Sequence, residues 1–461
     1  MMGVRNGARR MAGSFFGELL ETLSERGRAL LARRRPRGGG EDPATLCEAL
    51  LSGRGEASGV ALAEALLARW SRLDEAGQKA FLGLLNERFG PDRAKLDAAI
   101  EAYQARSDAA ALNAVHYASE PRRMELLRRL NGAPGGTLAL VRMREALLRH
   151  QASDATLGAL DADFVHLFSS WFNRGFLVLR RIDWATQANI LQKIIAYEAV
   201  HEIGDWDDLR RRIEPADRRC FAFFHPRLVD EPLIFVEVAL TDSVPAAIAP
   251  LLASARKTLA PERATTAVFY SISNCKEGLR GISFGHFLIK QVVEDLRREC
   301  PKIGAFVTLS PAPGFAKWLR REAEALDEAS RQRLAAPDWH DDPAAREALR
   351  APLLAAAARY FLLAKNAAGR PADPVARFHL GNGARLERLN FLGDVSAKGL
   401  AESHGLMVNY LYKLDEIEDN HEAYAETGEV AASSDIKKSL RADAKPLRGR
   451  PGMAENAASA T

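Results

Sequence analysis

Apolar residues in the first part of the chain recur three and four positions apart, the spacing of one face of an α-helix. These stripes follow one another from Thr45 to about Leu179, with turn residues such as Gly90-Pro91-Asp92 between them. Two of the stripes are Leu62, Leu66, Leu67 and Trp70, and Phe81, Leu84, Leu85 and Phe89. The pattern predicts a helical domain over residues 45–182. It contains no cluster of reactive side chains, so we expect a structural or assembly role for it.

The second half alternates between short β-type segments and longer helical ones. Segments rich in β-branched and aromatic residues predict strands, and these are Cys220–Phe224, Leu233–Leu240, 267–273, 305–310 and Leu386–Leu392. Helical stretches are predicted at 180–214, 245–264, 286–300, 317–365 and 396–414, and a glycine-flanked turn at 378–384. We therefore predict the α+β class, in which a helical amino-terminal bundle precedes a mixed α/β domain over residues 183–430.

The two ends of the chain have a different composition. Residues 1–44 begin with an Arg-rich amphipathic helix and end in the charged, Gly/Pro-rich stretch 33–44, which predicts a flexible linker. Residues 431–461 contain Ala, Ser, Lys and Arg with almost no large apolar side chain, which predicts a disordered tail.

Charge and cysteine usage exclude several classes of protein. A net charge of +4 over 461 residues is nearly neutral, so it gives no support to nucleic-acid binding, and no aromatic–basic interleaving accompanies the Arg-rich start. No apolar run approaches the roughly 20 residues that span a bilayer. The four cysteines show no C-x-x-C spacing, which favours a reducing compartment over a disulfide framework or a zinc site.

The amino-terminal 35 residues resemble a mitochondrial presequence in their arginine content, but Glu18, Glu21 and Glu25 are unlike one. No secretory signal is visible, and the chain ends in Ala-Ser-Ala-Thr rather than a peroxisomal address. We therefore expect a cytoplasmic protein of bacterial type rather than one of the mitochondrial matrix.

Residues 267–313 organise the rest of the chain. They predict a strand, a loop with Gly278, Gly281 and Gly285, a helix, and a second strand that ends at Ser310. A glycine-rich turn that opens a helix is suited to an anion, because free N–H groups and the helix dipole converge there. Arg280 lies in this turn. A βαβ unit without any ligand remains the alternative, since short glycine motifs also match by chance.

Two residues outside this turn are candidates for chemistry. His379 stands in a predicted turn with Gly381 and Gly383 and is able to exchange a proton near neutral pH, although a structural role is the common one for a single histidine. Ser310 ends a strand, where open α/β sheets bind their ligands, although serine there is also an ordinary turn residue. Asp394 is a candidate to orient His379, but spacing alone does not establish a triad.

Four segments together resemble malonyl-CoA decarboxylase. They are FYSISNCKEGLRGISFGHFLIKQVV, TLSPAPGFAKWL, FHLGNGARLERLNFLGDVSAKGL and SHGLMVNYLY, and the likeness extends in order from about Trp184 to Tyr412. The resemblance implies a helical oligomerisation domain and a catalytic domain like the GNAT (N-acetyltransferase) fold, in which the CoA pyrophosphate rests on a helix amino terminus. It also implies a lyase of fatty acid metabolism that releases CO2 from malonyl-CoA to give acetyl-CoA.

Carried over by position, the resemblance implies a catalytic pair, Ser310 and His379, with His379 as the proton donor. Tyr412 and Asn409 would complete the acyl pocket. The malonyl-CoA site would be lined by Arg280, Gly281, Ile282, Ser283, Phe284, Gly285 and His286. Ser283 departs from the pattern twice: it replaces the central glycine of the acetyltransferase loop, and it stands where animal members have an acidic residue.

The resemblance further implies that no metal, biotin or pyridoxal phosphate takes part, because the thioester itself delocalises the enolate charge. The expected partners are malonyl-CoA, acetyl-CoA and further copies of the chain, as a dimer or tetramer formed through the helical domain. Two alternatives stay open. One is a CoA-dependent N-acyltransferase, which would release free thiol instead of CO2, and the other is a non-enzymatic CoA-binding scaffold.

Overall fold

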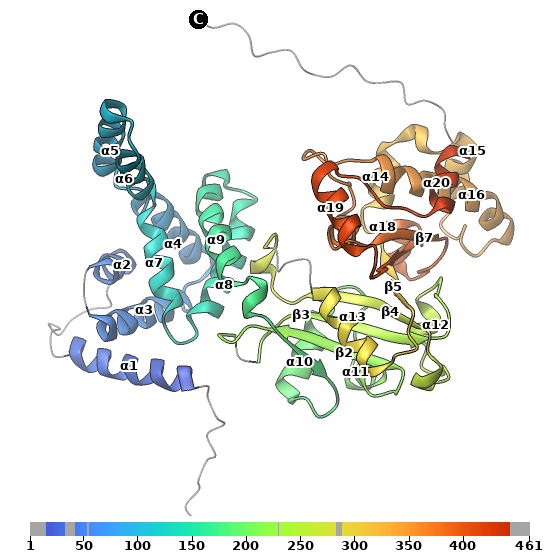
Figure 1. Cartoon of the computed structure of the whole chain (residues 1–461), viewed down its shortest axis with the longest axis horizontal. Helices are drawn as coiled ribbons and strands as arrows, with labels where there is room; N and C mark the ends of the chain where they lie inside the picture. Colours follow the sequence, from blue (N-terminus) through green and yellow to red (C-terminus); the bar gives the residue numbers. More distant parts are fainter. Residues whose placement is uncertain (1–14, 33–41, 53–54, 229, 283–287, 443–461) are drawn as a thin grey trace, which may run out of the picture.

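The computed structural model describes residues 15–32, 42–52, 55–228, 230–282 and 288–442. The described part of the chain forms a helical bundle followed by a domain built on a mixed sheet, which confirms the predicted fold class (Figure 1). The bundle contains α1 Phe15–Ala32, α2 Pro43–Leu51, α3 Glu56–Trp70, α4 Glu75–Arg88, α5 Arg93–Arg106, α6 Ala109–Ser119, α7 Arg122–Asn131, α8 Gly136–Gln151 and α9 Gly158–Trp171.

Aspartate side chains start many of these helices. Asp42, Asp74, Asp92 and Asp108 precede α2, α4, α5 and α6, and each accepts a hydrogen bond from the backbone N–H three residues ahead. Such caps satisfy amide groups that the first turn leaves unpaired, and each is worth about 1 kcal/mol. The apolar stripes then bury a common core that includes Leu126, Leu140 and Phe168. The bundle therefore follows directly from the stripe pattern.

The sheet has eight strands in the described residues, and it is antiparallel except where β4 and β5 run parallel. Its order is β1-β2-β3-β4-β5-β8-β6, and β7 pairs with β8. The strands are β1 Val178–Ile182, β2 Arg218–Phe224, β3 Pro232–Thr241, β4 Thr266–Asn274, β5 Ala305–Thr308, β6 Ser310–Pro311, β7 Arg385–Asn390 and β8 Met407–Leu411. Helix α13, Leu288–Glu299, joins β4 to β5 and completes the predicted strand–helix–strand unit.

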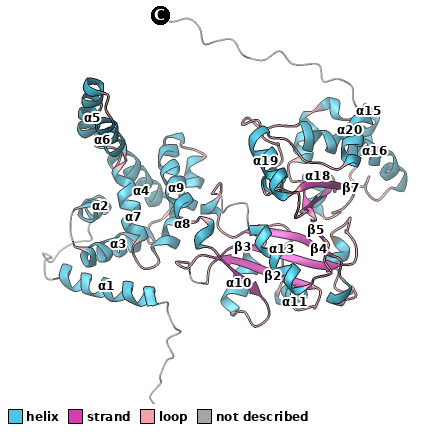
Figure 2. Ribbon diagram, in the orientation of Figure 1, coloured by secondary structure: helices cyan, strands magenta, loops and turns pink. Residues whose placement is uncertain are grey.

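Helices cover both faces of the sheet, and β2 shows how the sequence sets this arrangement. Phe221 and Phe223 pack in the large core with α13, whereas Cys220, Ala222 and Phe224 pack with α10 Ala188–Tyr197 and α11 Trp206–Ile213. Alternate residues of a strand point to opposite faces, so a strand covered on both faces is apolar throughout. Figure 2 shows these helices around the central strands.

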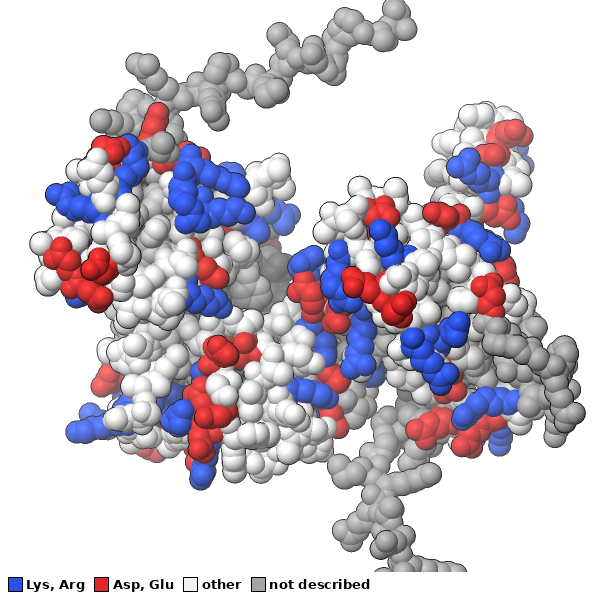
Figure 3. All heavy atoms as spheres, turned by 180° about the vertical axis from the view of Figure 1, so that it is seen from behind, with Lys and Arg blue, Asp and Glu red and all other residues white. Residues whose placement is uncertain are grey.

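The remaining helices are α12 Ala249–Leu252, α14 Phe315–Arg321, α15 Glu328–Leu334, α16 Pro343–Leu363, α17 Pro374–Gly381, α18 Ala397–Ser403, α19 Ile417–Thr427 and α20 Ser434–Ala442. Of these, α12 lies between β3 and β4, and the others follow β6 and build the last third of the domain. None of the helices in the described ranges is both long and apolar enough to cross a membrane. On the face shown in Figure 3, acidic and basic side chains are intermixed, as the small net charge leads one to expect.

Several predicted elements are wrong. The turn predicted at 378–384 is largely the end of helix α17, which begins with a start signal: Asp373 accepts a bond from the backbone N–H of Ala376, and Pro374 occupies the first turn. The helix predicted at 396–414 is helix α18 followed by strand β8, because His404 and Gly405 both take positive φ and end the helix. Residues 245–264 contain only α12 and one 3₁₀ turn.

Two predicted domain limits are also wrong. Strand β1 lies inside the range assigned to the helical domain, but it pairs with β2 and belongs to the sheet, which therefore starts before residue 183. The predicted tail begins with ordered chain: Ala432 bridges to Leu386, and Ile436 of α20 is buried. Composition failed there because a few apolar residues, the buried Ile436 and the partly buried Leu440, are enough to anchor a short helix. The predicted linker at 33–44 lies mostly outside the described residues.

The burial of Ile436 in α20 leads to a prediction about stability. Replacing Ile436 by Ala removes a side chain that is 3% exposed, and such truncations typically cost about 2–5 kcal/mol of unfolding free energy. The expected cost here is about 2 kcal/mol, measured by chemical denaturation, since α20 lies at the edge of the core. Lys437→Ala, on the exposed side of the same helix, serves as the control and should change the value by less than about 0.5 kcal/mol.

Candidate active site

The fold brings Ser310 and His379 together, although they lie 69 residues apart in the sequence. Ser310 is in strand β6, and His379 is in the last turn of α17. The Ser310 Oγ and His379 Nε2 atoms are 3.1 Å apart, and both side chains are buried. The prediction that folding pairs this hydroxyl with this imidazole is confirmed as geometry, while the catalytic role of the pair stays a prediction.

Neighbouring hydroxyl groups fix the orientation of the pair. The Ser310 hydroxyl donates to Thr308 Oγ1 at 2.9 Å, so its oxygen is free to accept the Nε2 proton of His379. The other ring nitrogen, Nδ1, lies 2.8 Å from the Tyr412 hydroxyl, which then donates to it. Tyr410 stacks on the imidazole, with ring centroids 4.6 Å apart. With Ser310 donating to Thr308, these contacts suit a neutral ring with its proton on Nε2.

Burial controls the charge of this histidine. Removal from water lowers the pKa of His379 to about 3, because the charged imidazolium loses its hydration and the described residues provide no carboxylate beside it. The ring is therefore neutral at physiological pH in the free protein. An anionic group placed beside it would favour the protonated form and raise the pKa.

Ser310 and His379 line a cavity of about 600 Å³. Apolar and aromatic side chains form most of its wall, including Phe269, Ile272 and Phe378. The same cavity is lined by Arg280 and Ile282 of the glycine-rich loop and by Leu288, the first described residue of α13. A single cavity therefore joins the hydroxyl–imidazole pair to the loop that the sequence identifies as an anion site.

Helix α8 of the bundle holds this loop from behind. Arg144 is 3% exposed, and its Nη1 donates to the carbonyl oxygens of Gly278 and Arg280, at 2.8 and 2.9 Å. Asp161 pairs with the same guanidinium at 2.8 Å. Gly278 is required by this packing, because a Cβ there would lie 2.1 Å from the carbonyl oxygen of Val141. The first loop glycine thus serves contact with the bundle rather than a ligand.

The other predicted site residues divide into two groups. Arg280 and Ile282 line the cavity, and Gly281 lies between them with a φ of +80°. Ser283, Phe284, Gly285 and His286 lie outside the described residues, as does the predicted helix start. Whether this segment holds an anion stays a prediction.

Tyr412 and Asn409 lie behind the cavity instead of lining it. Tyr412 contacts the far nitrogen of His379, and Asn409 is fully buried and donates to the carbonyl oxygen of Thr308 at 2.7 Å. Asp394 does not orient His379. It accepts from the backbone N–H of Ser396 at the start of α18, and the Tyr412 hydroxyl takes the position expected for it.

Sequence reasoning missed Thr308, Tyr410 and Val200. Thr308 precedes Ser310 by two residues on the same extended stretch, a spacing that places both side chains on one face, so a signal was present. Tyr410 was assigned to a helix and thereby lost its alternation with Tyr412. Val200 lines the cavity from an irregular segment after α10, and no sequence signal marks it.

Among the described residues, no group of three or more His, Cys, Asp or Glu side chains is placed to hold a metal ion. All four cysteines are free and buried. For Cys47, Cys220 and Cys275, burial raises the pKa of the thiol well above its usual value. Polar side chains that line the cavity include the Ser310 hydroxyl, the His379 imidazole and the guanidinium groups of Arg280 and Arg377.

An α+β chain with a buried hydroxyl–imidazole pair in a cavity has the organisation of an enzyme, and comparisons with known proteins give its family. The malonyl-CoA decarboxylase C-terminal domain matches residues 175–449, and the N-terminal domain of the same family matches residues 89–172. The mitochondrial malonyl-CoA decarboxylase of Anser anser anser is 36% identical over 410 residues, which cover 80% of this chain and 81% of that protein.

Solved structures agree with this match. A malonyl-CoA decarboxylase from Rhodopseudomonas palustris has 61% identity and a TM-score of 0.84, and one from Agrobacterium vitis has 60% and 0.82. Each alignment covers 87% of this chain and all of the other. The chain therefore belongs to the malonyl-CoA decarboxylase family, as the sequence motifs predicted.

The lowered pKa of His379 gives a second prediction. In the unfolded chain a histidine titrates near 6.5, so on acidification the unfolded state takes up a proton that the native state, with a pKa of about 3, does not. Between pH 7 and 5 the wild-type protein should lose about 2 kcal/mol more stability than His379→Asn, at 1.36 kcal/mol per pH unit below 6.5. Equal losses in the two proteins, measured by denaturant unfolding at each pH, would contradict a buried neutral ring.

Proposed function

We propose that the protein converts malonyl-CoA to acetyl-CoA and CO2, with Ser310 positioning the acyl group or the enolate and His379 donating the proton to the α-carbon. The observation that carries the proposal is the 3.1 Å contact between Ser310 and His379 in a cavity that also reaches the Arg280 loop. Membership of the family supports the reaction. The contact places a hydrogen-bond donor, the Ser310 hydroxyl, beside a group that can carry a proton, the His379 imidazole.

In the first step the bond between the carboxylate carbon and the α-carbon breaks, CO2 leaves, and the electron pair becomes an enolate of the thioester. Fixed donors at the oxygen that gains charge lower the barrier, and one such donor is typically worth about 3 kcal/mol. The Ser310 hydroxyl is the donor in this proposal. Its present acceptor, Thr308 Oγ1, lies within the site, so the hydroxyl can turn from Thr308 to the substrate without being left unpaired.

In the second step the α-carbon takes a proton from His379. The ring is neutral in the free protein, but a malonyl carboxylate beside it raises its pKa and favours the imidazolium. The Tyr412 hydroxyl can satisfy Nδ1 in either state, as a donor to the neutral ring or as an acceptor from the protonated one. Transfer of the Nε2 proton to carbon restores the neutral ring, which then takes its next proton from solvent.

The CoA end of the substrate is assigned to the Arg280 loop and the start of α13. Arg280 is largely exposed, and its partner in the described residues is Glu277, which is also exposed. A surface pair of this kind contributes little stability, so the guanidinium can leave it for a phosphate oxygen. Arg144 holds the backbone of the same loop in place from the bundle.

The helical domain is proposed to assemble copies of the chain. Apolar side chains are exposed on α5 and α6, and they are Ile100, Tyr103, Leu112 and Tyr117. These helices project from one end of the molecule (Figure 1), and exposed apolar side chains grouped on one projection are typical of association surfaces. The bacterial origin of the solved relatives supports the proposed cytoplasmic location.

Removing either partner of the pair should abolish most of the turnover. Ser310→Ala and His379→Asn are each expected to lower kcat for CO2 release by roughly 10²–10⁴-fold, the range for a lost oxyanion donor or general acid. Circular dichroism would establish that both variants fold. Ser330→Ala replaces a buried serine that does not line the cavity and should keep normal turnover.

Near-normal CO2 release by folded Ser310→Ala or His379→Asn would remove that residue from the mechanism. Free-thiol release measured in the same samples separates the proposed reaction from acyl transfer to an amine, which produces thiol and no CO2.

The contact between Arg144 of the bundle and the Arg280 loop should affect KM for malonyl-CoA. Arg144→Ala removes charge-assisted hydrogen bonds that are worth about 1.5–3 kcal/mol each, so we expect KM for malonyl-CoA to rise roughly tenfold or more with a smaller change in kcat. Arg144→Lys should restore part of the affinity. Arg142→Ala, an exposed arginine on the same helix, is the control. If KM stays normal in folded Arg144→Ala, the bundle does not position the loop.

A further inference from the structure

A small arginine-rich pocket lies on the α10–α11 side of the sheet, apart from the residues that line the large cavity. Its volume is about 90 Å³, and it is formed by α11, the start of β2 and the segment after α12. Four arginines line it, Arg211, Arg212, Arg218 and Arg256, together with the hydroxyl-bearing residues Ser254 and Thr258. Volumes of this size hold several water molecules or one small oxyanion.

The pocket has more positive than negative charge. Among its lining residues the one carboxylate is Asp208, which accepts from Arg212 at 3.1 Å and lies 3.4 Å from Arg211. Asp217 lies behind the wall and pairs with Arg256 at 2.5 and 3.0 Å. Four guanidinium groups therefore face these two carboxylates and, beneath Arg212, the buried Glu237 at 3.4 Å, so positive charge is in excess.

Two of these charges, Arg212 and Arg218, are deeply buried. Burial lowers the pKa of Arg212 but nearby carboxylates outweigh it and raise the pKa, so the poorly compensated charge is that of Arg218. Arg218 is 3% exposed and donates to the carbonyl oxygens of Leu251 and Asp217, so most of its partners are neutral. Burial lowers the pKa of Arg218, a sign that its charge is incompletely compensated. Beneath Arg212 lies Glu237, whose pKa burial raises to about 8, so this carboxyl group adds little negative charge at neutral pH.

We infer that this pocket binds a phosphoryl group, either free phosphate or the end group of a phosphate monoester. A phosphate dianion balances the excess charge, and guanidinium groups match its oxygens in geometry. Arg211 is the residue best placed to close over it, because it is half exposed and its partner in the described residues, Asp208, is 3.4 Å away.

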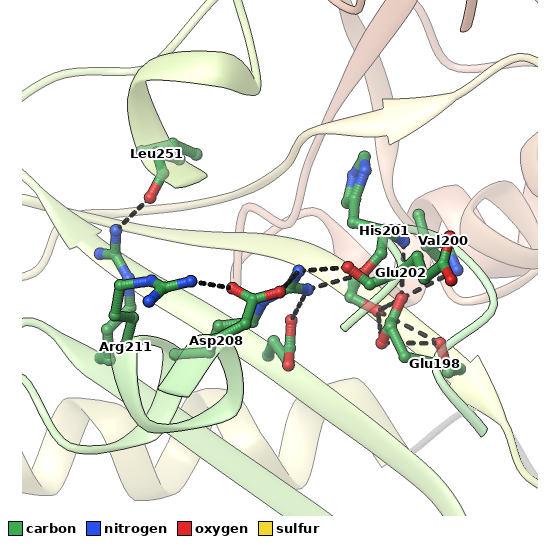
Figure 4. A network of polar contacts seen from close by, with 12 residues as sticks. Glu198, Val200, His201, Glu202, Asp208, Arg211 and Leu251 are labelled. Carbon is green, nitrogen blue, oxygen red and sulfur yellow. Dashed lines mark hydrogen bonds and ion pairs between the residues drawn. The ribbon is translucent and has the colours of Figure 1, made fainter. Parts of the chain in front are cut away.

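The pocket is connected to the wall of the large cavity through Arg212. Its Nη1 and Nη2 donate to the carbonyl oxygens of His201 and Glu202, each at 2.7 Å. Figure 4 shows His201 and Glu202 in the polar network that extends from Asp208 to Glu198. The preceding residue, Val200, lines the large cavity. Glu198 holds the same segment from its other end by accepting the backbone N–H groups of Val200 and His201 at 2.8 Å.

An anion that draws Arg212 toward the pocket would therefore pull on the segment that carries Val200. Binding at one site and at the other would be coupled to the extent that this segment has two arrangements. The effect on turnover rests on the proposed function, whereas binding of the anion does not.

The test is a calorimetric titration of the full chain, without CoA, using inorganic phosphate and, separately, glycerol 3-phosphate at constant ionic strength. We expect saturable binding of at least one of them. Arg211→Gln should weaken it roughly tenfold or more, as expected for a lost charged donor. The control is Arg210→Gln, the neighbouring arginine, which pairs with Glu214 and does not line the pocket; its affinity should stay within about twofold of the wild type.

The two phosphate compounds distinguish free phosphate from a monoester as the source. No saturable binding of either compound, an equal loss in the two variants, or displacement of the bound phosphate by CoA would overturn the site. The link through Arg212 is tested by KM for malonyl-CoA, which saturating phosphate should change more than about threefold in the wild type and in Arg210→Gln but not in Arg211→Gln. Binding without such a change would refute the link while leaving the site in place.

Discussion

The structure of the site depends on one constraint: buried polar groups in a chain must find their hydrogen-bond partners in one another. Tyr412, His379, Ser310 and Thr308 are linked in sequence by hydrogen bonds, and the backbone N–H of Tyr410 donates to the last of them at 3.1 Å. A buried polar group without a partner costs about 1–3 kcal/mol, so each member holds the next in a fixed orientation. Strand β8 makes this possible, because it carries Tyr410 and leads directly into Tyr412 while pairing with β5, β6 and β7.

Much of the fold was predictable because it follows from local patterns. Helical stripes gave the bundle, and apolar segments gave β2, β3, β4 and β5 to within a few residues. The errors arise around two glycines and run in opposite directions. Gly381 suggests a turn at 378–384 but lies at the end of helix α17, whereas the helix predicted at 396–414 passes over Gly405, which separates helix α18 from strand β8. Tertiary pairing with β7 decides that residues 407–411 are extended.

The predictability of the site was different. Ser310 and His379 are separate candidates from their local sequence, but their pairing came from the resemblance to a family, since no spacing rule joins residues so far apart in the chain. Tyr412 is predicted to line the acyl pocket, but its hydroxyl contacts Nδ1 of His379 from behind the cavity. The sequence does not tell which side of an imidazole a hydroxyl group occupies. Arg144 and Arg212 could not be found at all. Each is one arginine among many in the sequence, and only the folded contacts with carbonyl oxygens of distant loops distinguish them.

The close seating of Gly278 against Val141 has a consequence for how the protein can be divided. Helix α8 and the loop meet backbone to backbone, with no room for a methyl group between them. This contact between α8 and the loop cannot shift without separating main-chain groups that are packed against each other. Strand β1, which follows the bundle, also pairs with β2 and so joins the sheet. The two domains therefore have to be exchanged together. A chimera in which one domain comes from another protein would need that domain to keep the residues that contact its partner.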